Sequence, residues 1–186
     1  MAEIAAIEEI HGAYRVSPVV HEDQRGRFLE TYREEWFPGL PTMVQANRGD
    51  RIAGTVVGLH HHLYQADYWY VPFGTARVVL YDIRDGSPTE GCSWTTDLGA
   101  QPDGSHCHDG IYIPPGVGHG FAALTDTTMT YLVDGYYDPA DELGVAWDDP
   151  GLDVDWGVSN PVLSSRDRAN PRRADLPDSQ RPRFSR

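Results

Sequence analysis

Short stretches rich in β-branched and aromatic residues recur along the chain, and each is closed by a turn-forming sequence. Four stand out, at residues 68–71, 76–81, 110–113 and 128–133. Clusters of Pro, Gly, Asp and Ser follow them, as is typical of turns between strands. Many short strands at this spacing favour a sandwich or a barrel over units in which strands and helices alternate. The pattern therefore predicts an all-β fold.

Helical periodicity is scarce. Residues 32–37 predict one or two helical turns before Pro38, and little else has apolar residues at a 3.6-residue spacing. From Ser164 onward the chain becomes polar and basic, with prolines among the arginines, which is typical of a solvated tail. We therefore predict a single domain over residues 1–174 with few short helices, and a flexible polar tail over residues 175–186.

Charge narrows the range of partners. The chain has 186 residues, with 28 acids against 15 bases and a net charge of −13, which argues against nucleic acid or an anionic membrane. No stretch approaches the roughly 18–20 apolar residues of a membrane span, and residues 1–14 lack a basic region followed by an apolar run. Cys92 and Cys107 form neither a metal-spaced pair nor a disulfide framework. We expect a cytoplasmic protein with a small-molecule substrate.

Three consecutive histidines, His60, His61 and His62, are the strongest chemical signal. In an extended strand His60 and His62 point to one face and His61 to the other. With Asp67 and Gly74 further on, the spacing resembles the first metal motif of cupin barrels, with Asp in place of Glu. Residues 114–119 (PPGVGH) resemble the core of the second motif, which ends at His119, although the expected preceding Gly and following Asn are not in place.

These residues predict a mixed nitrogen and oxygen site. His60, His62, Asp67 and His119 would suit Fe(II), Mn(II), Ni(II), Zn(II) or Cu(II). The alternative is a pocket without a metal, in which His60 and His119 are hydrogen-bonded residues and His61 lies at the surface.

The chain as a whole resembles the dTDP-4-dehydrorhamnose 3,5-epimerase family from about residue 23 to residue 171. The number and order of the similar stretches carry the resemblance. They are 23–30 (DQRGRFLE), 45–47 (QAN), 58–60 (GLH), 82–89 (DIRDGSPT), 113–121 (IPPGVGHGF), Tyr131 with 136–139 (YYDP) and Glu142, 148–150 (DDP) with Trp156, and 163–167 (LSSRD).

The resemblance implies a cupin-type double-stranded β-helix, or jelly-roll, barrel that forms a homodimer with exchanged strands and needs no metal. It also implies carbon-acid chemistry, in which a base removes a proton next to a ketone and an acid returns one to the opposite face. His60 would be the base, Asp167 the carboxylate that holds it, and Tyr131 the acid. A histidine titrates near neutral pH, and a carboxylate partner fixes its tautomer and raises its basicity.

Substrate recognition follows from the same resemblance. Arg25 matches an arginine near the diphosphate, while Gln45 and Asn47 match residues near the base and sugar. The full set of expected substrate-binding residues is Arg25, Phe28, Glu30, Gln45, Asn47, His119 and Glu142.

Two positions depart from the family pattern. Val57 occupies the position at which the family commonly has a phosphate-binding arginine. Asp67 occupies the position of a family lysine that stabilises the substrate oxygen as negative charge develops on it. A carboxylate facing an enolate oxygen would lose several kcal/mol of stabilisation. A metal on Asp67 and His62 would restore the missing charge as a Lewis acid. As a metal ligand, however, His60 could not also be the base.

Three hypotheses remain open. The first is an isomerase that acts on a carbonyl-activated carbon acid through an enolate, with or without a metal. Its substrate would be a nucleotide-linked keto-sugar or another carbonyl compound such as a natural-product intermediate. The second is a metal-dependent oxygenase, in which Fe(II) on three histidines and one carboxylate activates O2. The third is a metabolite-binding cupin without catalytic activity.

Overall fold

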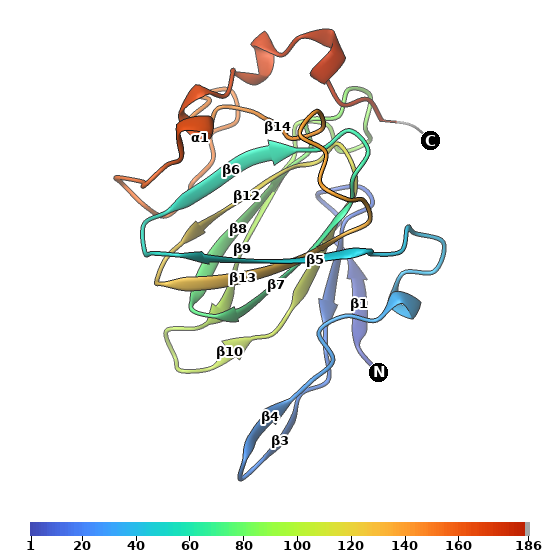
Figure 1. The fold of residues 1–186 in the computed structure, drawn as a ribbon, viewed down its shortest axis with the longest axis vertical. Helices are drawn as coiled ribbons and strands as arrows, with labels where there is room; N and C mark the ends of the chain where they lie inside the picture. Colours follow the sequence, from blue (N-terminus) through green and yellow to red (C-terminus); the bar gives the residue numbers. More distant parts are fainter. Residues whose placement is uncertain (185–186) are drawn as a thin grey trace.

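Two six-stranded antiparallel sheets face each other in the computed structural model, which describes residues 1–184 (Figure 1). Their strand orders are β1-β2-β11-β7-β13-β5 and β10-β9-β8-β12-β6-β14, and β3 and β4 form a separate hairpin. The strands are β1 Glu3–Ala6, β2 Tyr14–Ser17, β3 His21–Asp23, β4 Gly26–Phe28, β5 Gln45–Arg51, β6 Val56–His61, β7 Asp67–Phe73, β8 Thr75–Tyr81, β9 Ser93–Ala100, β10 His106–Cys107, β11 Gly110–Ile113, β12 Gly118–Ala123, β13 Thr127–Val133 and β14 Leu143–Gly144. The predicted all-β jelly roll is confirmed.

The four predicted strands appear as β7, β8, β11 and β13, within two residues of their expected ends. The helical turn expected before Pro38 is a 3-10 turn over Glu34–Trp36. One short helix was not predicted, α1 over Ser165–Ala169, which begins where the Ser164 hydroxyl accepts a hydrogen bond from the Asp167 amide. No helix in the part of the chain that the structure describes is long and apolar enough to cross a membrane.

Apolar side chains fill both faces of the second sheet. Between the two sheets, residues such as Val78, Leu80, Ile111 and Met129 form one core. On the outer face of the second sheet, Val56, Leu59, Val79, Tyr81 and Trp156 form another, under the C-terminal third of the chain. Each buried side chain of this size stabilises the fold by about 1.5–3 kcal/mol. Strand β6 therefore lies with both faces covered.

The segment expected to be a flexible tail packs against this outer face instead. Leu176 is buried, and the Gln180 carbonyl accepts a hydrogen bond from His61 at 2.9 Å. Arg183 pairs with Asp85 as a parallel bridge. The segment is polar in composition, but the apolar side chain of Leu176 and backbone groups such as the Gln180 carbonyl hold it against the barrel. Residues 185–186 of the predicted tail lie outside the described residues.

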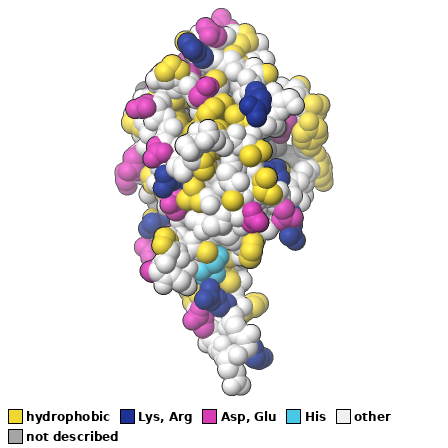
Figure 2. Space-filling view, turned by 90° about the vertical axis from the view of Figure 1, so that its left-hand side faces the viewer, with side chains coloured by type: hydrophobic (Ala, Val, Ile, Leu, Met, Phe, Trp, Pro, Cys, Tyr) yellow, Lys and Arg dark blue, Asp and Glu magenta, His cyan; other side chains and the backbone are white. Residues whose placement is uncertain are grey.

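The β3–β4 hairpin projects away from the barrel (Figure 1), and Figure 2 shows it as a tapered extension at the lower end of the molecule. All six of its strand residues are exposed. Phe28, at its end, exposes 71% of its surface, which is unusual for an aromatic residue of this size.

Candidate active site

A cavity of about 370 Å³ lies between the two sheets. Strands β5, β7 and β13 line one wall, β6 and β12 line the opposite wall, and residues near β14 and α1 line its mouth. Its polar lining residues include Gln45, Asn47, Arg51, His60, His62, Gln65, Asp67, His119, Tyr131, Glu142 and Arg166.

A bulge in β6 sets which side chains enter the cavity. Across the β12–β6 pair, His119 lies opposite His60 but Phe121 lies opposite Val57, so β6 carries one extra residue. Val57 and His60, three positions apart, therefore both reach the cavity. Gly58, inside the bulge, has a φ of +115°, and a Cβ there would approach the Gly120 Cα and the His119 carbonyl at 2.8 Å. Only glycine fits this position.

His60 is paired with a buried carboxylate. Its Nε2 lies 2.5 Å from Oδ1 of Asp167, and the Ser164 hydroxyl donates to the other oxygen at 2.7 Å. Burial alone would raise the pKa of Asp167, but the hydrogen bonds from His60 and Ser164 outweigh it and lower that pKa. The ionised carboxylate holds a proton on Nε2 and leaves Nδ1 to accept one. This is the arrangement of an oriented general base.

Tyr131 enters the cavity from the opposite sheet. It lies on β13, opposite Asn47 of β5 and Trp69 of β7. Burial raises the pKa of its phenol, and the nearby charges of Asp67 and Glu142 raise it further. The hydroxyl therefore keeps its proton at neutral pH and is able to donate it.

Three of the four predicted metal ligands form a cluster. One ligand atom from each of His62, Asp67 and His119 lies within 4.8 Å of the others, and all three residues are buried. His60, the fourth predicted ligand, is not in this cluster, and its Nε2 bonds Asp167. The structure thus separates His60, the candidate base, from the other three candidate ligands.

Burial shifts the pKa values of two residues in this cluster. It raises the pKa of Asp67, against the opposing effects of His62 and of hydrogen bonds from Trp69 and Gln65. It also lowers the pKa of His119 far below its usual value, and the neighbouring His62 and His60 lower it further. His119 is therefore neutral at physiological pH.

His61 points away from the cavity, as strand alternation predicts, but it does not lie at the surface. It is fully buried under the C-terminal segment, and burial lowers its pKa to about 4. The interpretation of His61 as a surface residue is wrong, because the outer face of β6 is covered.

The expected substrate-binding residues divide into two groups. Gln45, Asn47, His119 and Glu142 line the cavity. Gln45 donates to the Asn47 side chain at 2.9 Å, and Glu142 pairs with Arg166 at 2.5 Å. The second group, Arg25, Phe28 and Glu30, lies on or beside the projecting hairpin and is not among the residues that line the cavity. Within one chain, the hairpin leads these three side chains away from the site.

Two cavity arginines were not predicted from the sequence. Arg51 follows Gln45, Asn47 and Gly49 at a spacing of two along β5, so strand alternation could have placed it on the same face. Arg166 belongs to the polar, basic stretch that begins at Ser164, and only the position of α1 brings it to the cavity.

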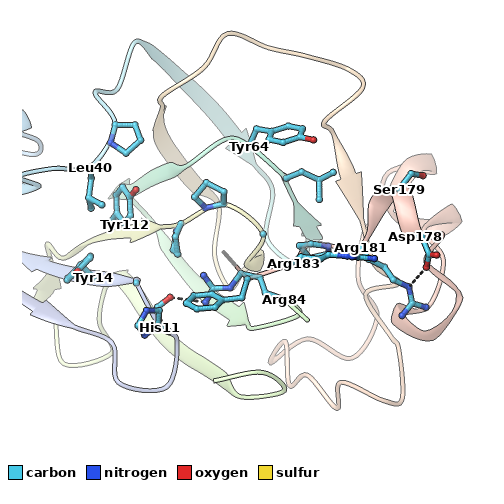
Figure 3. Close-up of a pocket in the computed structure, with 18 residues that line it drawn as sticks. His11, Tyr14, Leu40, Tyr64, Arg84, Tyr112, Asp178, Ser179, Arg181 and Arg183 are labelled. Carbon is cyan, nitrogen blue, oxygen red and sulfur yellow. Dashed lines mark hydrogen bonds and ion pairs between the residues drawn. The ribbon is translucent and has the colours of Figure 1, made fainter. Parts of the chain in front are cut away.

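A larger cavity, of about 720 Å³, lies between the β1–β2 turn, β11 and the C-terminal segment (Figure 3). Its lining includes His11, Tyr14, Tyr112 and residues of the C-terminal segment. Arg84 enters it but is already bound to Asp82 at 2.7 Å. Since neither the His60–Asp167 pair nor Tyr131 lies there, the smaller cavity is the candidate active site.

Comparison with known proteins identifies relatives along almost the whole chain. The family model for dTDP-4-dehydrorhamnose 3,5-epimerase matches residues 8–175. A dTDP-4-dehydrorhamnose 3-epimerase of Streptomyces niveus is 37% identical over 171 residues, which cover 86% of this chain and 78% of the relative.

Solved structures share the fold, among them two epimerases. The 4-keto-6-deoxy sugar epimerase NovW of Streptomyces spheroides has a TM-score of 0.89 and 34% identity, covering 99% of this chain and 94% of its own. An epimerase of Legionella pneumophila in complex with dTDP-4-keto-L-rhamnose also has a TM-score of 0.89, with 27% identity and full coverage of both chains. This protein is an epimerase-type enzyme that belongs to the dTDP-4-dehydrorhamnose 3,5-epimerase family.

Proposed function

We propose that the enzyme inverts a carbon next to the ketone of a nucleotide-linked 4-keto-6-deoxy sugar. The observation that carries this proposal is the pairing of His60 with Asp167 on one wall of the cavity, with Tyr131 on the opposite wall. A base and an acid on opposite sides of a bound sugar are what inversion at a carbon acid requires.

Nδ1 of His60 takes the proton from the carbon beside the ketone. The electron pair of the broken C–H bond forms the enolate, whose negative charge rests on the ketone oxygen. Tyr131 then donates its proton to the opposite face of the same carbon. Solvent exchange returns the proton from His60 to Tyr131, so the cycle has no net redox change.

The relatives support a thymidine diphosphate sugar as the substrate. One relative is named a dTDP-4-dehydrorhamnose 3-epimerase, and one solved relative contains dTDP-4-keto-L-rhamnose. Val57 occupies the position at which the family commonly has a phosphate-binding arginine. In this chain two other arginines, Arg51 and Arg166, line the cavity. We assign diphosphate recognition to Arg51, since Arg166 is neutralised by Glu142.

We further propose a homodimer in which the β3–β4 hairpin of each chain reaches the partner's cavity. The exposed Phe28 supports this arrangement, as does Arg25, which is not among the residues that line the cavity of its own chain. Light scattering should give twice the chain mass of 20.7 kDa. An Arg25→Ala variant should have a higher KM with little change in kcat. A monomer with full activity would reject the arrangement.

The free thiols of Cys92 and Cys107 fit the cytoplasm, a reducing compartment.

Incubation of the enzyme with dTDP-4-keto-6-deoxyglucose in D2O tests the reaction directly. We expect deuterium at C3, at C5 or at both, read by NMR, and the positions labelled distinguish a 3-epimerase from a 3,5-epimerase. A His60→Asn variant should lose the exchange by about 10²-fold or more. A lack of deuterium at both carbons with the unmodified enzyme would rule out this substrate.

A further inference from the structure

The enolate oxygen needs a positive partner, and the chain has few groups to supply one. The sequence contains no lysine at all. Of the two cavity arginines, Arg166 is bound to Glu142, and the guanidinium of Arg51 lies beside Gly49 at the exposed end of β5. The buried part of the cavity holds Asp67 instead, a residue that would repel the enolate if it were ionised and alone.

Asp67 is not alone, because two histidines converge on it. The ligand atoms of His62, Asp67 and His119 lie within 4.8 Å of one another, at the buried side of the cavity. Two ligands of one transition-metal ion stand at most about 4.2 Å apart. Small side-chain rotations would therefore bring all three into bonding distance of a shared ion. Two imidazoles and one carboxylate are a common donor set for divalent first-row ions.

The surroundings orient each of these side chains. Nδ1 of His62 lies 2.8 Å from the Asp141 carbonyl, and Nδ1 of His119 lies 2.9 Å from the Val117 carbonyl. A carbonyl only accepts, so both Nδ1 atoms carry the proton and both Nε2 atoms keep a lone pair when the rings are neutral. Asp67 accepts hydrogen bonds from Trp69 and Gln65 at 2.9 and 3.0 Å, one on each oxygen. Hydrogen bonds of this kind fix the ligands of metal sites.

We propose that His62, Asp67 and His119 bind one divalent first-row transition-metal ion, which holds the ketone oxygen of the substrate as a Lewis acid. Three protein ligands leave coordination positions open for that oxygen. His60 remains bonded to Asp167 and stays free to act as the base. The role of the ion in catalysis rests on the function proposed above, whereas the binding of the ion does not.

Metal titration tests the binding independently of any substrate. Full-length protein stripped with a chelator is titrated with Zn²⁺ by calorimetry and with Co²⁺ by visible absorption. We expect one ion per chain. Asp67→Ala and His62→Gln should each weaken binding by at least about 100-fold, since even the loss of an orienting partner costs 10–100-fold. If Asp67→Ala fails to fold, the isosteric Asp67→Asn serves in its place, and near-UV circular dichroism checks both.

Two matched histidine variants sharpen the test. His60→Asn should keep the ion, because His60 is outside the ligand set, and the exposed His21→Gln should keep it as well. A loss of binding in His60→Asn would overturn the three-residue site in favour of one that includes the base. Absence of binding by the unmodified protein, or equal affinity in Asp67→Ala, would overturn the proposal altogether.

The deuterium exchange assay then tests whether the bound ion takes part in the proposed reaction. We expect exchange to fall on chelation, to return with added Zn²⁺ or Co²⁺, and to persist without O2. Full exchange in the stripped enzyme would overturn the Lewis-acid role while leaving the epimerase intact. Tight binding without exchange in any form would confirm the ion and reject this sugar as the substrate. Activity that stops without O2 would instead support the oxygenase hypothesis and overturn the Lewis-acid role.

Discussion

Asp167 holds the proposed catalytic base although the two residues are 107 positions apart in the sequence. It is 3% exposed and touches His60 through a single short hydrogen bond. Its effect on the reaction is therefore indirect, through the tautomer and orientation of the imidazole. In the proposed mechanism Asp167 is therefore a positioning residue, and a substitution that keeps its shape isolates that role.

An Asp167→Asn variant should lower kcat by about 10²-fold or more with little change in KM. The amide can donate to Nε2, which stabilises the tautomer with the proton on Nδ1, the atom that must accept a proton. Steady-state kinetics measures the change, and the exposed Asp175→Asn is the matched control. A rise in KM at constant kcat would show that Asp167 supports substrate binding instead.

Tyr131→Phe should separate proton removal from inversion. His60 would still form the enolate and could return a solvent deuteron to the original face. We therefore expect deuterium exchange into unchanged substrate to persist while inverted product falls by about 10²-fold or more. NMR of the sugar after incubation in D2O measures both. Loss of all exchange would indicate that Tyr131 is needed for the first step.

At the scale of elements, the bulge in β6 is the feature that builds the site. A regular strand would place Val57 and His60 on opposite faces, and the bulge brings both to the cavity. It depends on Gly58, whose positive φ and close backbone neighbours exclude any side chain.

Gly58→Ala should therefore destabilise the protein by about 2–4 kcal/mol, the sum of strained backbone and overpacking. Urea denaturation measures the loss as a lower midpoint at unchanged slope. Gly135→Ala is the control, because a Cβ there meets nothing within 4 Å. Equal stability of the two variants would show that β6 tolerates a side chain inside the bulge.

Local sequence patterns predict the strands well but not what interrupts them. Turn clusters bound residues 76–81 and 128–133, and both strands formed where expected. The bulge at Gly58 was missed because it is defined by the register against β12, which alternation within β6 does not reveal. Helix α1 was missed because five residues are too few for a helical period.

Over the whole molecule, Asp82 joins distant parts of the chain. It is fully buried at the end of β8, and it binds Arg84, Ser87 and Thr89. Arg84 in turn donates to the His11 carbonyl, which ties this loop to the N-terminal strands.

Burial alone would raise the pKa of Asp82, but its hydrogen bonds outweigh burial and lower the pKa to about 2. A lowered pKa stabilises the fold above the unfolded value near 3.8, and that stability is lost as the pH falls toward 2. We expect this group to account for about 2 kcal/mol of lost stability between pH 4 and pH 2. Urea titrations should show this component in the native protein and in the exposed control Asp148→Asn, but not in Asp82→Asn.

The global arrangement was the part that the sequence predicted least. The resemblance supplied His60, Tyr131 and Asp167 as a set. The structure places His60, bonded to Asp167, on one wall of the cavity and Tyr131 on the opposite wall. The sequence could not show that Arg25 and Phe28 project away from the barrel of their own chain, because a hairpin sequence does not specify what the hairpin packs against. Which cluster His60 belongs to also needed three-dimensional contacts.

Proteolytic cleavage of the projecting hairpin would also report whether the chain has bound a partner. Trypsin cuts after lysine and arginine, and this chain offers it arginines alone. Arg25 and Arg27 stand on the hairpin with side chains that are 86% and 46% exposed. A lone chain should be cleaved there early, whereas a hairpin docked on a partner should be protected. The rate at which fragments beginning at Gly26 or Phe28 appear, followed across protein concentrations, would give the dissociation constant of the proposed dimer.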